Sequence, residues 1–256
     1  PVAASANSNC TSFNRTSLPF TLYSDPSPRH ILLVTSMVSL SLKILGAFLC
    51  LLSKSGKSKE LLDKAVYGHT TTKNQIIQLI TQWITNPSSG GNVIGIQGPM
   101  GNGKTTLVKE GIAKAINRPF AFIALGGASD SAFFDGHSYT YEGSHWGRII
   151  DILIDSKCMN PIIYFDELDK VSRTENGKEI IGILTHLIDP TQNEGFQDKY
   201  FNGIDIDMSK ALFIFSYNDV SAIDRILLDR IHRIKFDHLT LFDKLEITKK
   251  YILPEL

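Results

Sequence analysis

The sequence predicts a three-layer α/β fold built on a mainly parallel sheet of five strands. From about residue 60 onward, short apolar runs alternate with helical stretches, as in proteins whose parallel strands are joined by helices. One apolar run leads directly into a glycine-rich loop, and another ends in two acidic residues. The hydrophobic content of 43% and the charged content of 20% are typical of a globular domain with a sizeable core.

The first elements of this domain are predicted to be two helices, a strand and a third helix. Leu61–Val66 and Thr72–Ile84 place apolar side chains at helical spacing. Val93–Gln97 is a short apolar run before the glycine-rich loop, which predicts a buried parallel strand. Thr105–Ile116 returns to helical spacing and is predicted to be the helix that follows the loop.

Four further apolar runs predict the rest of the sheet. They are Phe120–Leu125, Ile162–Phe165, Leu212–Ser216 and Ile231–Phe236. The first three of these runs are apolar almost throughout, which indicates strands covered on both faces, as in parallel sheets. We therefore expect an α/β domain over residues 60–240.

Residues 1–59 are predicted to be an atypical N-terminal segment. Asp25 is its only acidic residue, and residues 31–52 form an apolar stretch interrupted by Lys43. The stretch is long enough to span a bilayer, but a lysine near its middle costs about 2.5 to 3.5 kcal/mol on insertion. Four interpretations stay open: a membrane anchor, a buried helix of another domain, a targeting segment, or a translation upstream of the true domain. The expected compartment is the cytoplasm, with membrane anchoring through residues 31–52 as the alternative.

Charge and cysteine content argue against several classes of protein. The formal net charge is zero, whereas proteins that bind nucleic acid usually carry a basic surface. The three cysteines, Cys10, Cys50 and Cys158, are far apart and form no CxxC pair. We therefore expect no nucleic-acid partner, no disulfide framework and no zinc site.

The glycine-rich loop satisfies the pattern G-x-x-x-x-G-K-[ST]. It comprises Gly98, Pro99, Met100, Gly101, Asn102, Gly103, Lys104 and Thr105, followed by Thr106. Glycines let successive backbone N–H groups curl around phosphate oxygens, and the following helix presents its positive end to them. Lys104 is expected to contact the β- and γ-phosphates, and the Thr105 hydroxyl to bind Mg²⁺. The loop therefore predicts an ATP and Mg²⁺ site of the P-loop NTPase type.

Asp166 and Glu167 end the apolar run Ile162–Phe165. A carboxylate at the tip of a buried strand is costly unless it is paired or bound to a metal. Asp166 is expected to hold Mg²⁺, and Glu167 to activate the attacking water as a general base.

Two more polar residues fit the same chemistry by their order in the chain. Asn218 follows the run Leu212–Ser216, where its amide is expected to orient the water or touch the γ-phosphate. Arg230 is expected to reach a nucleotide bound by a neighbouring subunit and to stabilise the charge of the transition state in trans.

From about Leu61 to Leu256 the chain resembles the AAA+ module of Lon-type ATP-dependent proteases. The similarity extends well beyond the phosphate loop and is carried by several motifs in order. They are Ala65-Val66-Tyr67-Gly68, Leu125-Gly126-Gly127, Asp135-Gly136-His137, Thr140-Tyr141, Gly147-Arg148-Ile149-Ile150, Asp166-Glu167-Leu168-Asp169-Lys170, Leu187-Ile188-Asp189-Pro190-Thr191-Gln192-Asn193, Asp198-Lys199-Tyr200, Met208-Ser209-Lys210, Leu227-Leu228-Asp229-Arg230 and Tyr251-Ile252-Leu253-Pro254.

The resemblance implies a homohexamer that hydrolyses ATP to pull unfolded polypeptide through a central pore. It implies that Tyr67 and Gly68 lie near the adenine and that Tyr141 grips the substrate. Asn218 would be the first sensor and Arg230 the inter-subunit arginine finger. Residues 241–256 would begin a small helical subdomain. The aromatic strand before Asn218 and the choice of loop residues suggest a divergent branch of the family, of the kind carried by large DNA viruses.

The chain also departs from the family pattern. Glu142 follows the predicted pore tyrosine, where the family usually has an apolar residue, and a charge there would reduce apolar grip. No Ser–Lys peptidase domain is present up to Leu256, so peptide cleavage is expected only if such a domain follows.

The leading hypothesis is therefore an ATPase motor that unfolds and translocates protein for proteolysis. The alternative is an AAA+ remodeller of nucleic acid, such as a clamp or helicase loader, which the neutral charge and Tyr141 disfavour. A nucleotide-binding scaffold without hydrolysis is disfavoured because the residues needed for turnover are all of the required type. These are Lys104, Thr105, Asp166, Glu167, Asn218 and Arg230.

Overall fold

A computed structural model describes residues 56–86, 93–128, 130–140, 142–171 and 174–255. All of them belong to one compact unit that spans Leu49–Leu256. The apolar stretch 31–52 and the predicted pore residue Tyr141 lie outside the described residues. Within the described ranges, no helix is both long enough and apolar enough to cross a membrane.

Five parallel strands form the sheet, as predicted. They are β1 (Val93–Gln97), β2 (Phe120–Ala124), β3 (Ile162–Asp166), β4 (Leu212–Tyr217) and β5 (His232–Lys235). Their order across the sheet is β2-β3-β4-β1-β5, and every pairing is parallel. The predicted strand ranges agree with these bounds to within one residue at each end.

Helices connect the strands. Residues 56–65 are helical and precede α2 (Thr70–Thr85). The helix after the glycine-rich loop is continuous over three parts: α3 (Lys104–Thr106), the π-helical η1 (Leu107–Ile112) and α4 (Ala113–Ile116). The later α-helices are α5 (Ala132–Asp135), α6 (Arg148–Ser156), α7 (Glu175–Ile188), α8 (Arg225–Asp229) and α9 (Leu241–Ile247). Short 3₁₀ segments are η2 (Leu168–Lys170), η3 (Asn193–Gly195), η4 (Val220–Ala222) and η6 (Leu253–Glu255), and η5 (Thr248–Ile252) is π-helical.

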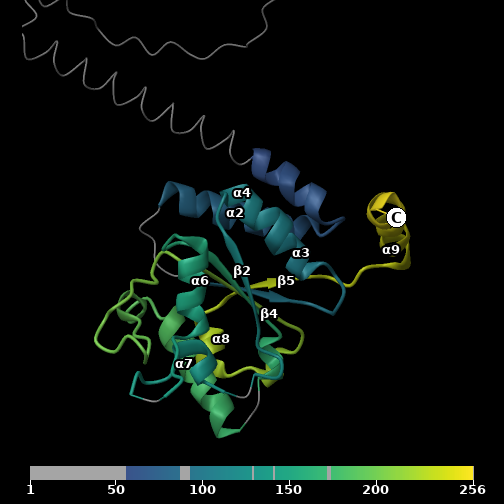
Figure 1. Cartoon of the computed structure of the whole chain (residues 1–256). Helices are drawn as coiled ribbons and strands as arrows, with labels where there is room; N and C mark the ends of the chain where they lie inside the picture. Colours follow the sequence, from purple (N-terminus) through teal and green to yellow (C-terminus); the bar gives the residue numbers. More distant parts are fainter. Residues whose placement is uncertain (1–55, 87–92, 129, 141, 172–173, 256) are drawn as a thin grey trace, which may run out of the picture. The chain divides into compact units, whose positions relative to one another are not determined.

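The sheet separates two hydrophobic clusters, so the described domain has three layers (Figure 1). Alternate residues of a strand face opposite sides of the sheet. In β4, Phe213 and Phe215 pack in one cluster with the buried residues of α6 and α7. Leu212 and Ile214 pack in the other with α2, η1 and the helical residues 56–65. The predicted three-layer α/β fold is confirmed.

The order of the strands determines where a ligand can bind. After β1 the chain crosses to β2 at the far edge, and after β4 it passes β1 to form β5 on its other side. The chain therefore leaves β1 toward one edge of the sheet, at β2, and later leaves β4 toward the opposite edge, at β5. In open parallel sheets, ligands bind beyond the carboxyl ends of the strands at such a switch point, and the glycine-rich loop follows β1.

Candidate functional site

Two hydrogen bonds join the glycine-rich loop to the ends of the strands on either side of β1. The N–H of Gly98 donates to the carbonyl of Tyr217 at the end of β4 (3.1 Å). The side-chain amide of Asn102 donates to the carbonyl of Asp237, beyond β5 (2.8 Å). Gly103 has φ of 77°, a left-handed conformation that glycine adopts without steric cost, and the helix begins at the next residue. The loop thus turns the free N–H groups of the helix start toward the space above β1.

Oxygen atoms surround the ammonium group of Lys104. Its Nζ donates to the carbonyl of Gly98 (2.5 Å) and to Oδ1 of Asn218 (2.7 Å), and it lies 3.4 Å from the carbonyl of Pro99. Partial burial lowers the pKa of Lys104, and nearby carboxylates, chiefly Asp166, oppose that shift. The predicted phosphate-loop lysine and the predicted sensor are therefore in direct contact, although 114 residues separate them in sequence.

Ser216 joins the two acidic residues at the end of β3. It is 1% exposed, and its hydroxyl donates to Oδ1 of Asp166 in a short hydrogen bond. The same Oγ accepts the backbone N–H of Glu167 (3.3 Å). Because β3 and β4 are adjacent, a side chain of β4 contacts both the Asp166 carboxylate and the Glu167 backbone.

Glu167 has a left-handed backbone, with φ of 59° and ψ of 48°. This conformation is uncommon for a residue with a side chain and is often found at functional sites. Its carboxylate lies against Gly126, just after β2: a Cβ added to that glycine would come within 2.2 Å of Oε2 of Glu167. Only glycine at position 126 leaves the Glu167 carboxylate where it is.

Tyr164 extends the network from Asp166 to the helix after the loop. Its hydroxyl lies 3.4 Å from Oδ1 of Asp166 and 3.2 Å from Oγ1 of Thr105. Burial raises the pKa of Tyr164 to about 12. The phenol is therefore uncharged and can both donate and accept a hydrogen bond.

These side chains meet at one cavity of about 490 Å³. Residues 100–106 of the loop and helix start form one wall, and the ends of β3 and β4 contribute Asp166, Glu167, Ser216 and Asn218. The structure thus brings together the loop, the acidic pair and the predicted sensor.

A second cavity of about 530 Å³ shares part of this wall, at residues 101–103 and Thr106. Its remaining lining is largely apolar and includes Val66, Tyr67, Leu239 and Ile247. Gly68 follows at a turn with φ of 72°. A polar cavity beside an apolar one suits a ligand with a charged end and a flat apolar end. Apolar walls bind the flat end, and a few polar groups orient the ligand.

Arg230 lies apart from both cavities. Its guanidinium donates to Oδ2 of Asp189 from Nη2 (2.8 Å) and Nε (3.2 Å), and to the carbonyl of Ile226 (3.1 Å). Hydrogen bonds from the N–H and hydroxyl of Thr191, with a further contribution from Arg230, lower the pKa of Asp189 to about 2. The structure therefore does not place Arg230 with the other predicted site residues of its own chain.

The donors at the polar cavity suit Mg²⁺. Among the described residues, no three His, Cys, Asp or Glu side chains are grouped as a metal site. Mg²⁺, however, is commonly held by one or two carboxylates together with water and substrate phosphates. Thr105 and Asp166 supply hard oxygen atoms, linked through Tyr164, and so fit this kind of site.

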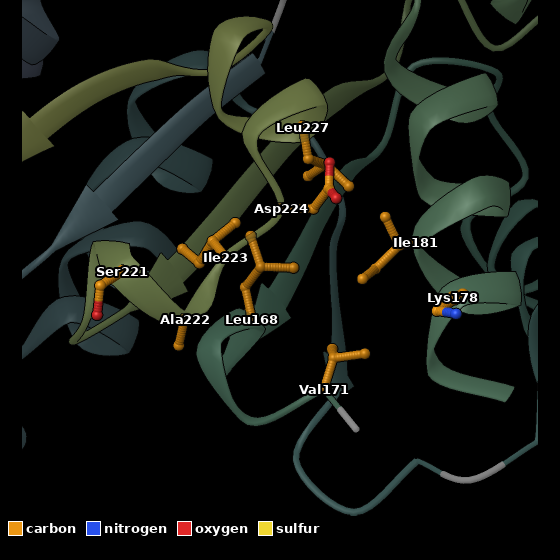
Figure 2. A pocket seen from close by; sticks show the side chains of 9 residues that line it. All are labelled: Leu168, Val171, Lys178, Ile181, Ser221, Ala222, Ile223, Asp224 and Leu227. Carbon is orange, nitrogen blue, oxygen red and sulfur yellow. The ribbon is translucent and has the colours of Figure 1, made fainter. Parts of the chain in front are cut away.

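A further pocket, of about 350 Å³, has a largely apolar lining. Figure 2 shows side chains of η2, α7, η4 and α8 around it, with Leu168, Ile181 and Ile223 directed toward the space. None of the predicted site residues lines this pocket.

Three residues of the site were not predicted to belong to it: Gly126, Tyr164 and Ser216. The available signal for two of them was a hydroxyl-bearing residue in an apolar run, Tyr164 in Ile162–Phe165 and Ser216 in Leu212–Ser216. Most buried hydroxyl groups have hydrogen-bond partners, and both strands end at the polar cavity.

Comparison with known proteins identifies related sequences. A model of the family described as "ATPase family associated with various cellular activities (AAA)" matches residues 94–238, more than half of the chain. The chain is 43% identical over 196 residues to a Lon protease homolog of Acanthamoeba polyphaga mimivirus. It is 40% identical over 199 residues to the Lon protease of Clostridioides difficile (strain 630). It is 39% identical over 197 residues to the peroxisomal Lon protease homolog 2 of Zea mays.

These similarities cover 76% to 78% of this chain but only 19% to 25% of the three relatives. The chain therefore spans about a fifth to a quarter of the length of the relatives that it matches.

Proposed function

This chain belongs to the AAA family of ATPases, and on that premise we propose that it is the ATP-driven motor of a Lon-like protease. The family match makes it an ATPase, and the predicted resemblance to the AAA+ module of Lon-type proteases is confirmed by relatives at 39% to 43% identity. One of these relatives is viral, in keeping with the predicted branch. Unfolding, translocation and proteolysis belong to the proposal, because the chain matches only part of each relative.

The observation that supports this function best is the meeting of three strand ends at one cavity. Lys104 contacts Asn218, and Ser216 contacts both Asp166 and Glu167. The loop after β1, the acids after β3 and the amide after β4 therefore surround the same space, as ATP hydrolysis requires.

Each group has a role in the proposed reaction. The loop N–H groups and Lys104 bind the β- and γ-phosphates, and the apolar cavity at Tyr67 receives the base. Thr105 and Asp166 would hold Mg²⁺, which when bound neutralises charge on the phosphates. Glu167 takes the proton of the attacking water, and Asn218, already 2.7 Å from the lysine, orients that water beside the terminal phosphate.

The mechanical part of the proposal concerns subunits and substrate. We expect a hexamer in which Arg230 contacts the nucleotide of the neighbouring subunit and Tyr141 contacts unfolded polypeptide in the pore. The position of Arg230 away from both cavities of its own chain supports a role toward a neighbour.

The proposed substrate class predicts what stimulates the ATPase. Addition of a permanently unfolded polypeptide is expected to raise the rate of ATP hydrolysis by the purified chain, because binding in the pore favours the assembled, active form. Single-stranded and double-stranded DNA at equal mass are expected to leave the rate unchanged. Stimulation by DNA and not by unfolded protein would contradict the motor of a protease and favour a nucleic-acid remodeller.

Lys104→Ala is expected to weaken ATP binding by about 10- to 100-fold, since a charged hydrogen bond to phosphate contributes about 1.5 to 3 kcal/mol. The measurement is a fluorescence titration with a labelled ATP analogue. Lys109→Ala is the matched control, because Lys109 is an exposed lysine of the same helix. Equal affinity in the Lys104 variant and this control would remove the lysine from the site.

A further inference from the structure

Tyr164 occupies a distinctive position between two functional residues. The side chain is fully buried, and its hydroxyl lies within hydrogen-bond distance of both Thr105 and Asp166. Its ring packs beside Phe120 and Phe122, with centroids 6.0 Å and 5.9 Å away. Phenylalanine would fill the same space, so packing explains the ring and leaves the hydroxyl to be explained.

The chemistry of the three groups determines the direction of the hydrogen bonds. An ionised aspartate only accepts hydrogen bonds, and a phenol is neutral at pH 7 and has one hydrogen to donate. The hydroxyl of Tyr164 therefore donates to Asp166, and its oxygen accepts the hydrogen of the Thr105 hydroxyl. The lone pairs of Thr105 Oγ1 are then directed away from the phenol and are free to bind a cation.

The same arrangement distinguishes the two oxygens of Asp166. Both Ser216 and Tyr164 donate to Oδ1. Two donors on one oxygen hold the carboxylate plane in a single orientation, because rotation about χ2 would break both bonds. Oδ2 then provides the remaining acceptor capacity toward the cavity.

We propose that Tyr164 is a positioning residue for the divalent cation of the ATPase site, acting by orienting the lone pairs of Thr105 and Asp166. The inference rests on the proposed function, because it assigns these two residues to Mg²⁺. The proposal goes further in giving a role to Tyr164, a residue inside β3 that contacts neither the nucleotide nor the metal. Tyr164 affects metal binding only through the two residues that would hold the metal.

Tyr217 shows that a buried phenol in this sheet does not require such partners. It is 1% exposed on the adjacent strand, and its hydroxyl makes no hydrogen bond to any described residue. Because Tyr217 also lines the polar cavity, the control for loss of a phenol hydroxyl is taken from Tyr200, which lines neither cavity.

The test is the gain in nucleotide affinity that Mg²⁺ confers. A labelled ATP analogue is titrated into the full chain with Mg²⁺ and again with EDTA, and the ratio of the two dissociation constants is compared between variants. Tyr164→Phe is expected to reduce this ratio by about five- to tenfold, an effect of the size that loss of a hydrogen-bonding hydroxyl causes, and to leave the affinity in EDTA unchanged. Tyr200→Phe is expected to keep the parent ratio.

A double-mutant cycle separates positioning from general loosening of the core. If Tyr164 acts through Thr105, the Tyr164→Phe change has a smaller effect on the ratio in a Thr105→Ala background than in the parent. Additive effects, or a parent ratio in Tyr164→Phe with an unchanged melting temperature, would overturn the proposal. Should Tyr164→Phe fail to fold, Tyr164→Leu removes the same hydroxyl and is held to the same outcomes.

Failure of the proposed function has a different signature. A parent chain that does not bind the nucleotide in either Mg²⁺ or EDTA would refute the ATPase site itself. A parent chain with a clear Mg²⁺ gain that Tyr164→Phe retains would refute only the role of the tyrosine.

Discussion

Glu167→Gln is expected to slow ATP hydrolysis by about 10²- to 10⁴-fold and to leave ATP affinity unchanged. General bases contribute to rates by about this factor, and glutamine has nearly the same shape but cannot take the proton of water. The Glu167 backbone N–H still meets Ser216, so the local conformation should persist. The measurements are single-turnover hydrolysis and a nucleotide titration on the same preparation.

Glu175→Gln provides the matched control. Glu175 is exposed at the start of α7 and pairs only with Lys178, another exposed side chain, among the ion pairs of the described residues. It should hydrolyse ATP at the parent rate. Parent turnover in the Glu167 variant would show that the base is misassigned, and a loss of affinity equal to the loss of rate would indicate a role in binding.

Gly126 restricts where the Glu167 carboxylate can lie. The Glu167 carboxylate lies where a side chain at residue 126 would be, so its position depends on a glycine from the next strand. A displacement of about 1 Å at a reacting group is enough to cost about 10²-fold in rate. The Glu167 backbone is therefore held by Ser216 of β4, and its carboxylate has room only because residue 126 carries no side chain.

Arg230→Ala is expected to reduce ATP turnover by about 10³- to 10⁵-fold in the assembled oligomer, the range known for arginines that act in trans. ATP affinity should stay near the parent value, because Arg230 contacts neither cavity of its own chain. The measurement is steady-state hydrolysis by preparations whose assembly is established by sedimentation. A parent rate in the assembled variant would remove Arg230 from the mechanism.

The ion pair between Arg230 and Asp189 requires a second variant. Loss of the arginine also leaves Asp189 without this partner, and a structural effect of the broken pair could slow turnover by itself. Asp189→Asn weakens the pair but retains the arginine, and it should hydrolyse ATP far faster than Arg230→Ala. Equal rates in the two variants would mean that Arg230 acts through its ion pair alone.

Local sequence patterns were sufficient to predict much of the fold and the composition of the candidate site. The run Val93–Gln97 is a strand with the same bounds in the structure, because a short apolar segment before a glycine loop has few alternatives. Helix ends were less predictable: Thr72–Ile84 was expected, and α2 covers Thr70–Thr85. The terminal residues of a helix have few hydrogen bonds of their own and depend on local contacts, such as that of Thr72 with the carbonyl of Lys235 (2.8 Å).

The proposed chemistry of the site could be predicted without a structure, because the prediction depends on residue type and local spacing. Glycines, a lysine and a threonine within nine positions, and two acids after an apolar run, indicate phosphate and metal chemistry wherever they occur. Only the folded chain could show that Ser216 contacts the Asp166 carboxylate and the Glu167 backbone, that Tyr164 joins Thr105 to Asp166, and that Gly126 makes room for Glu167. Apart from the contact between Tyr164 and Asp166 within β3, these contacts join residues that are 40 or more positions apart. Their geometry depends on the order and register of parallel strands, which no local pattern encodes.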